Sequence, residues 1–142
     1  MDLRAKKPLA DLEVYGNYIA DMRLLWSKDS TLVAYFEPDR RGGTTSIYFR
    51  NGSKFEQVEF PQSELGECDG NSKAEGDEKY LKTTEATTSP KQWLKSRALV
   101  VVIDESWLTE GGNEHHCSET VTIAFDANHK ASVQSVTDKK VD

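Results

Sequence analysis

Two stretches of the chain, residues 26–37 (WSKDSTLVAYFE) and residues 93–104 (WLKSRALVVVID), share one pattern. The pattern continues after a gap, because residues 47–49, a turn and a lysine resemble residues 123–125, a turn and a lysine. An internal repeat limits the possible folds, since each copy is normally one supersecondary unit. Each unit here is predicted to contain a Trp, a polar turn and three strands. The matched pairs are Trp26 with Trp93, Lys28 with Lys95, Leu32 with Leu99, Val33 with Val100, Phe36 with Ile103, Glu37 with Asp104, Ile47 with Ile123, Phe49 with Phe125 and Lys54 with Lys130.

The apolar runs after each Trp predict strands. Residues 99–103 are five consecutive aliphatic residues, four of them β-branched, and such residues favour strands. Residues 31–37 are nearly all apolar and are expected to be buried on both faces. Between residues 44–50 and 54–60 lies Asn51-Gly52, which favours a type I′ hairpin turn. Almost no helical periodicity is present, so we predict an all-β fold of about eight short antiparallel strands.

The chain of 142 residues is long enough for one domain with its own core. We therefore predict a single all-β domain over residues 1–142, with repeat units at roughly residues 22–60 and 90–137. Residues 62–90 and 107–118 are predicted to be mostly irregular. Loops this long in a compact domain are usually functional or disordered.

The charge of the chain narrows the classes of partner. A formal net charge of −6 and a pI of about 5.1 argue against nucleic acid or an anionic membrane surface, since both require a basic surface. The same charge suits a basic protein partner, and it also suits simple solubility. No segment approaches the roughly 18 apolar residues of a membrane span.

The first residues, MDLRAKKPLADLE, lack the apolar region of a signal peptide. Either the protein is cytoplasmic, or a signal peptide has been removed. We expect the second, with a periplasmic location, because of the cysteine content and the strand-rich pattern. Cys68 and Cys117 are the only cysteines, and each lies in a polar stretch between predicted strands. In an oxidising compartment they are expected to form a disulfide, worth on the order of 4 kcal/mol in the chain-entropy model. In the cytoplasm they would be two free thiols.

The segment W-S-x-D-S-x-x-V-A-Y-F, followed by a hairpin strand, resembles the blades of WD40-like propellers. It is most similar to the bacterial periplasmic type, in which a W-S-P-D-G-like corner precedes an apolar strand. Closed propellers have typically about 4–8 blades, and this chain has material for two. The resemblance therefore implies two blade-like sheets, arranged as a small sandwich or an open pair, that bind through loops or an outer face. The matching residues are Trp26, Ser27, Asp29, Ser30, Val33, Ala34 and Tyr35, and the second copy keeps Trp93, Val100, Val101 and Val102 but has Leu94 and Ser96 where Ser and Asp are expected.

In size, acidity and loop layout the chain also resembles small periplasmic immunity proteins of type VI secretion systems, which block cell-wall hydrolases. That resemblance implies a disulfide-containing inhibitor that plugs the active-site cleft of a toxin, a secreted peptidoglycan hydrolase or amidase. No diagnostic motif of the class occurs in the sequence, so no residue role is transferred from it.

The sequence contains no strong catalytic or metal-binding motif. Residues 114–117 (EHHC) are the most metal-like cluster, but neighbouring residues on an extended chain point to opposite sides, so His115 and His116 do not suit one zinc ion. The acidic residues between 69 and 78 lack the EF-hand spacing. A nucleophilic Cys117 with one of the histidines is an alternative. We predict no catalytic residue, no metal and no cofactor.

Two segments are candidate partner-binding surfaces. Residues 107–113 (WLTEGGN) follow the most apolar strand, and they combine a Trp, a favoured interface anchor, with a flexible Gly pair. Residues 84–90 (TEATTSP) are small and polar and could run extended through a groove. In the alternative, Trp107 packs on the edge of the core and residues 84–90 are a linker. The predicted partner-binding residues are Thr87, Thr88, Ser89, Trp107, Leu108, Thr109, Glu110, Asn113 and Glu114.

We predict from these features a periplasmic protein-binding module without enzymatic activity, of the immunity or inhibitor kind. The first alternative is a structural subunit that completes a larger β assembly in the cell envelope, because two-blade chains have exposed sheet edges. The second alternative is a hydrolase or metal enzyme.

Overall fold

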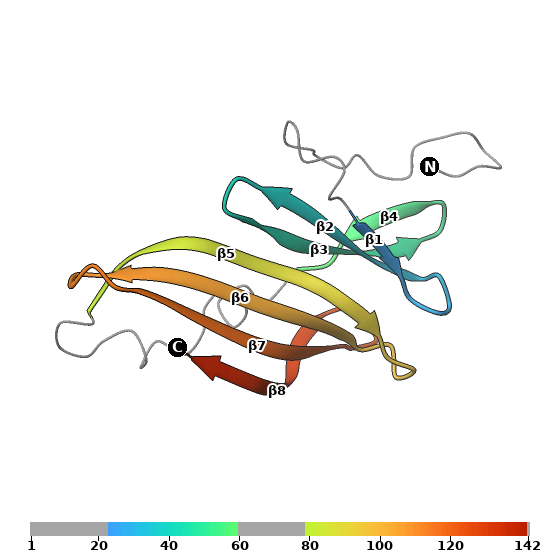
Figure 1. Cartoon of the computed structure of the whole chain (residues 1–142). Helices are drawn as coiled ribbons and strands as arrows, with labels where there is room; N and C mark the ends of the chain where they lie inside the picture. Colours follow the sequence, from blue (N-terminus) through green and yellow to red (C-terminus); the bar gives the residue numbers. More distant parts are fainter. Residues whose placement is uncertain (1–22, 60–78, 142) are drawn as a thin grey trace.

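The computed structural model describes residues 23–59 and 79–141, and this part of the chain contains eight β-strands and no helix (Figure 1). The predicted all-β fold is confirmed. The strands are β1 (Arg23–Trp26), β2 (Leu32–Asp39), β3 (Gly42–Asn51), β4 (Lys54–Gln57), β5 (Tyr80–Trp93), β6 (Leu99–Thr109), β7 (Glu114–Phe125) and β8 (Ala131–Val141).

The strands form two antiparallel meanders, β1 to β4 and β5 to β8, which we call the first and the second meander (Figure 1). They belong to one open sheet with the order β1-β2-β3-β5-β6-β7-β8, in which β4 also pairs with β3. The junction is a parallel pairing of only two residues on each side, Gly42 with Ala86 and Gly43 with Thr87. The two blade-like units are therefore halves of one hydrogen-bonded sheet.

Both meanders contribute to one hydrophobic core. Apolar side chains from β2, β3, β6 and β7 bury against one another across the junction, so neither meander carries a separate core of this size. The core residues are Leu32, Ala34, Ile47 and Val58 from the first half of the chain and Leu99, Val101, Ile103, Val121, Ile123 and Ala131 from the second.

The repeat in the sequence corresponds to the repeated order of strands, but its alignment is wrong in one place. Leu32 and Leu99 each begin the second strand of a meander and are fully buried. Leu32 pairs with Phe49, whereas Leu99 pairs with Ile123. The structural counterpart of Ile123 is therefore Phe49 and not Ile47. Because the shift is of two residues, the side chains stay on the predicted face.

The two tryptophans that the repeat matched lie on opposite faces of the sheet. Trp26 pairs with Val33, whereas Trp93 pairs with Leu99. The turn after Trp26 is one residue longer: hydrogen bonds close it between residues 27 and 32, but close the other between residues 94 and 98. A shift of one residue turns a strand's side chains to the other face.

The different faces give the two tryptophans different environments. Trp93 packs against the core, and its Nε1 donates a hydrogen bond to the backbone oxygen of Leu25 at 2.9 Å. Trp26 is 49% exposed and contacts Phe55 edge-on, with ring centroids 5.4 Å apart. The second Trp therefore joins the two meanders, and the first lies at the surface.

The predicted hairpin between β3 and β4 is confirmed, with a different turn. Asn51 pairs with Lys54, so the two central residues are Gly52 and Ser53 instead of Asn51 and Gly52. Of these two, only Gly52 has a positive φ, 63°. That pattern is typical of a type II′ turn, which places Gly at the first central position.

Candidate functional site

The outer face of the second meander, which faces away from the shared core, carries the most distinctive polar surface that the structure describes. In β6 every second residue from Leu99 to Thr109 is buried, with Val100 the one further buried position, and the residues between them from Val102 onward are half-buried. This alternation puts Asp104 and Ser106 on the outer face. Asp104 pairs with Thr87, and Ser106 lies between Glu85 on β5 and His116 on β7.

These five residues, Glu85, Thr87, Asp104, Ser106 and His116, line an open groove of about 270 Å³. We call it the outer-face groove. The Nε2 atom of His116 lies 3.4 Å from Oδ1 of Asp104, and both side chains are nearly half exposed. The groove thus combines two carboxylates, two hydroxyls and an imidazole on three hydrogen-bonded strands, whose pairing fixes their positions.

The residue types in the groove raise the possibility of a Ser-His-Asp triad, but the geometry does not form one. Such a triad requires a hydrogen bond from the serine to the histidine. Within the described ranges, His116 contacts Asp104, and no hydrogen bond joins it to Ser106. The same ranges contain no group of three or more side chains suited to hold a metal ion. The groove therefore presents charged and polar side chains without either arrangement.

The turn between β6 and β7 adjoins the groove. Its ends are closed by a hydrogen bond from the amide of Thr109 to the carbonyl of Asn113, and the amide of Glu110 donates to the carbonyl of Lys79 before β5. Gly112 has a φ of 85° and open space around it. Glu110, Asn113 and Glu114 are exposed, so these three predicted partner-binding residues are accessible.

Two other predicted binding residues in this segment are core residues. Trp107 and Thr109 are each only 1% exposed, so both side chains lie inside the protein, and a role for them in binding a partner stays a prediction. The physical reason is that β6 continues to Thr109, which gives both side chains the core-facing parity of Leu99. The alternative for Trp107, packing at the edge of the core, is confirmed. Leu108, between them, is half-buried.

The predicted polar segment at residues 84–90 lies within β5 and is neither a loop nor a linker. Thr87, Thr88 and Ser89 are half-buried. Thr87 lines the outer-face groove. Thr88 accepts a hydrogen bond at its backbone oxygen from Oγ1 of Thr45, at 2.6 Å, and so helps to join the meanders.

The two histidines of the EHHC cluster point to opposite sides, as predicted. His115 stacks on Trp107 with ring centroids 5.8 Å apart, and His116 lies in the outer-face groove. Cys117 is fully buried beside Trp107 and is not a free thiol. Its predicted partner Cys68 lies outside the described residues, so the Cys68–Cys117 disulfide stays a prediction.

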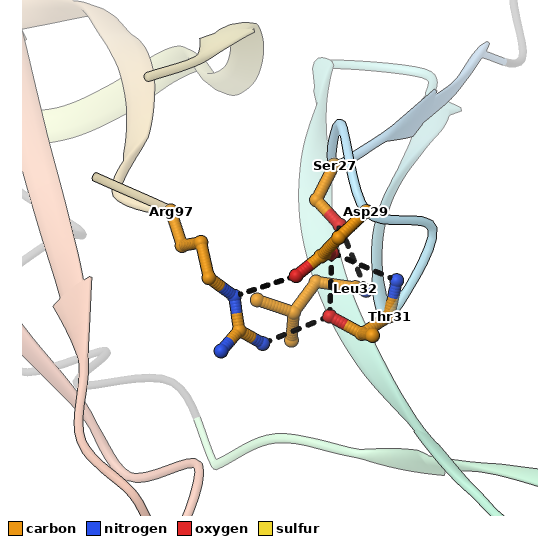
Figure 2. A network of polar contacts seen from close by, with 5 residues as sticks. All are labelled: Ser27, Asp29, Thr31, Leu32 and Arg97. Atoms are coloured by element: carbon orange, nitrogen blue, oxygen red, sulfur yellow. Dashed lines mark hydrogen bonds and ion pairs between the residues drawn. The ribbon is translucent and has the colours of Figure 1, made fainter. Parts of the chain in front are cut away.

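A second polar network joins the turns of the two repeats (Figure 2). Oδ1 of Asp29 accepts hydrogen bonds from the Ser27 hydroxyl at 2.8 Å and from the amide and hydroxyl of Thr31 at 3.0 and 2.6 Å. Arg97, from the other meander, lies 3.1 Å from Oδ2 of Asp29. The hydrogen bonds from Thr31 and Ser27 lower the pKa of Asp29 from 3.8 to about 2. Because every partner is used within the turn or the junction, we interpret this network as structural.

Sequence reasoning identified the corner but missed the groove. Asp29 and Ser27 belong to the W-S-x-D-S pattern, and each accepts a hydrogen bond from a nearby backbone amide, Asp29 from Thr31 and Ser27 from Leu32. Glu85, Asp104 and Ser106 were not predicted as site residues. The alternation of polar Asp104 and Ser106 with buried neighbours was the available signal, but their meeting with Glu85 depends on the bulges in β5.

No protein-family model, curated protein or solved structure matches the chain. Within residues 23–59 and 79–141, no helix is long and apolar enough to cross a membrane.

Proposed function

We propose that this protein is a non-enzymatic protein-binding module whose contact surface is the outer-face groove together with the turn at residues 110–114. The observation that carries the proposal is the groove itself, an open polar depression on paired strands. Its position is fixed by β6, which pairs with β5 on one side and with β7 on the other over most of its length. Binding groups held on such a support lose little conformational entropy on association.

The charge of this surface indicates the kind of partner. Glu85 and Asp104 line the groove, and Glu110 and Glu114 lie at the adjoining end of the same hairpin. Together with the net charge of −6, these carboxylates favour a basic protein surface and would raise its association rate.

The specific role that we propose is that of a periplasmic immunity protein, which blocks a toxin that hydrolyses the cell wall. The exposed turn at residues 110–114 is the segment best placed to enter a cleft, because it projects from the end of two long strands. The proposed disulfide Cys68–Cys117 would anchor the segment before β5 to β7 near this turn. Each meander contains four antiparallel strands, as a propeller blade does, which supports the proposed resemblance to blades.

The proposal is tested by affinity capture from periplasmic and secreted fractions, followed by an inhibition assay on the captured protein. We expect a hydrolase whose release of dye from labelled peptidoglycan stops at a one-to-one ratio. The variant Glu85→Gln/Asp104→Asn should inhibit less, whereas Glu56→Gln/Glu59→Gln, which removes the same charge from exposed positions of the first half, should inhibit normally. A captured protein that keeps full activity would overturn the inhibitor role.

The edge strand β8 favours a second candidate function, a structural subunit of a β assembly. β8 has eleven residues, lies at one edge of the open sheet and is exposed over most of its length. An unpaired edge can accept a strand from another chain. Light scattering after size-exclusion chromatography tests this role, since a strict monomer at high concentration would count against self-pairing.

A further inference from the structure

We propose that the outer-face groove is a subsite for one arginine side chain of the partner. This inference rests on the proposed function, because it names the chemical group that the same surface would recognise. It begins from the two carboxylates. Glu85 and Asp104 lie on neighbouring strands and are diagonal neighbours in the register, since Glu85 pairs with Ser106 and Asp104 pairs with Thr87. Diagonal neighbours have Cα atoms about 7–8 Å apart, so flexible acidic side chains can approach one cation from both sides.

The carboxylates have unused acceptor capacity. Glu85 makes no side-chain hydrogen bond or ion pair within residues 23–59 and 79–141, and Asp104 contacts His116 through Oδ1 only. A carboxylate can accept about four hydrogen bonds at its two oxygens. The Nε2 atom of His116 already lies 3.4 Å from Oδ1 of Asp104, so a nitrogen-bearing side chain within the groove can approach this carboxylate.

The other lining groups suit a guanidinium better than an ammonium ion. Arginine presents five N–H donors in a fixed planar fork, whereas lysine is a compact, strongly hydrated charge. The hydroxyls of Thr87 and Ser106 lie beside the two carboxylates and can accept the remaining donors. The groove volume of about 270 Å³ lies below the roughly 300–1,000 Å³ of pockets for drug-sized ligands. That size fits a single side chain.

Other charged side chains near the groove would affect how strongly its carboxylates bind an arginine. Glu114 lies two residues before His116 on β7 and accepts a hydrogen bond from Thr84 at 3.3 Å, so it adds negative charge at one end. Two lysines share this face in the register: Lys82 on β5 pairs with Leu108, two residues beyond Ser106, and Lys140 on β8 pairs with Ser118, two residues beyond His116. His116, Lys82 and Lys140 are therefore the side chains that an incoming arginine must compete with.

The test is an NMR titration of the isotope-labelled full chain with N-acetyl-arginine methylamide. We expect saturable shifts at the backbone amides of residues 85–87, 104–106 and 116. The citrulline analogue, which has the same shape without the charge, should bind at least about tenfold more weakly, since charge-assisted hydrogen bonds are lost. The lysine analogue should also bind more weakly than arginine. Equal shifts with citrulline, or equal affinity for lysine, would overturn the arginine subsite.

Two variants make the test specific to the groove. Glu85→Gln/Asp104→Asn should lose the arginine response while keeping a well-dispersed spectrum, because both side chains lie on the open face. Glu56→Gln/Glu59→Gln should keep the response. Binding that survives in the groove variant places the arginine elsewhere and overturns the proposal.

The outcomes separate the subsite from the proposed function. If arginine binds in the groove but no captured hydrolase is inhibited, the subsite stands and the immunity role fails. If a hydrolase is inhibited equally well by the wild type and by the groove variant, and arginine gives no shifts, the immunity role stands and the subsite fails.

Discussion

The two meanders repeat one strand order but bury their strands differently. In β2 the five residues from Leu32 to Phe36 are all buried, so both faces of that strand are covered. In β6 buried residues alternate with half-buried ones beyond Val100. The polar outer-face groove lies on the second meander, where β6 presents Asp104 and Ser106 beside side chains of β5 and β7. The comparison indicates that the repeat preserves the core face, while the opposite face differs between the copies.

The turns after Trp26 and Trp93 explain why the two copies of the repeat differ in three dimensions. One additional residue after Trp26 is enough to put the two matched tryptophans on opposite faces. Trp93 therefore hydrogen-bonds across the junction between the meanders, whereas Trp26 lies at the surface. Matching residue types in a β repeat therefore do not imply matching roles unless the turn lengths also match.

The largest expected effect comes from truncating the matched leucines. Leu32→Ala and Leu99→Ala each remove a fully buried side chain from the shared core, so each should lower the free energy of unfolding by about 3 kcal/mol. Because the core is shared, both variants should shift the same cooperative transition. Urea unfolding followed by Trp fluorescence and by circular dichroism measures this.

Leu24→Ala is the control for the leucine variants, since Leu24 is 51% exposed and should change stability by no more than about 0.5 kcal/mol. Two separate transitions, each moved by only one of the leucine variants, would show that the meanders unfold independently. The single-core comparison would then be wrong.

The next effect concerns the junction between the meanders. Gly42 has a φ of 136°, and a Cβ there would lie 2.0 Å from the backbone oxygen of Ala86. Gly42→Ala should therefore cost about 3 kcal/mol, because the strand must move away from β5 or adopt a strained backbone. Thermal and urea unfolding measure the loss.

Gly52→Ala is the matched control for the junction variant. Gly52 also has a positive φ, 63°, but nothing lies within 4 Å of the added Cβ. The expected cost is about 1–2 kcal/mol, from the positive φ alone. If both variants lost the same free energy of unfolding, the close contact between Gly42 and Ala86 would not contribute to the cost at Gly42.

Much of the fold could be predicted from the sequence, for identifiable reasons. The aliphatic run at residues 99–103 lies in β6 as expected, and the hairpin after β3 is present, although its central residues are Gly52 and Ser53 instead of Asn51 and Gly52. The serines and threonines of residues 84–90 favour an irregular segment, because both residue types are common in loops, although threonine is also β-branched and fits a strand. The predicted loop at residues 107–118 begins too early, because β6 continues to Thr109 and the Gly pair begins two residues beyond its end.

The candidate site was harder to predict because it depends on register. The groove requires that Thr87 meet Asp104 and that Glu85 meet Ser106, and these pairings follow a bulge between Thr83 and Glu85. A bulge moves every later residue of the strand by one position relative to its partner. Periodicity along one strand can therefore indicate which β6 residues face outward, but it does not indicate which β5 residues face them.

A smaller effect distinguishes the two tryptophans. Trp93→Phe keeps an aromatic ring at the core but leaves the backbone oxygen of Leu25 without its 2.9 Å hydrogen bond, at an expected cost of about 2 kcal/mol. Trp26→Phe changes a half-exposed ring and should cost no more than about 0.5 kcal/mol. Chemical denaturation of both variants measures the difference. A larger loss for Trp26→Phe would contradict their assignment to opposite faces.

The smallest expected effect concerns Asp29, which faces Arg97. This effect depends on pH. The pKa of Asp29 is about 2 in the folded protein against an ordinary value of 3.8. A lowered pKa means that ionised Asp29 stabilises the fold above pH 3.8 and that this stability is lost as the pH falls toward about 2. The carboxylate is 44% exposed, so solvent screening should hold its contribution below about 1 kcal/mol. The difference in stability between the wild type and Asp29→Asn should therefore shrink between pH 4 and pH 2.

Two further variants identify the cause of that pH dependence. The hydrogen bond from the Thr31 hydroxyl is the largest contribution to the lowered pKa, and the charge of Arg97 is a smaller one. Thr31→Val should therefore remove more of the pH-dependent stability than Arg97→Met, as measured by urea unfolding at a series of pH values. The opposite order would show that attraction across the two meanders, rather than hydrogen bonding within the first turn, keeps Asp29 ionised.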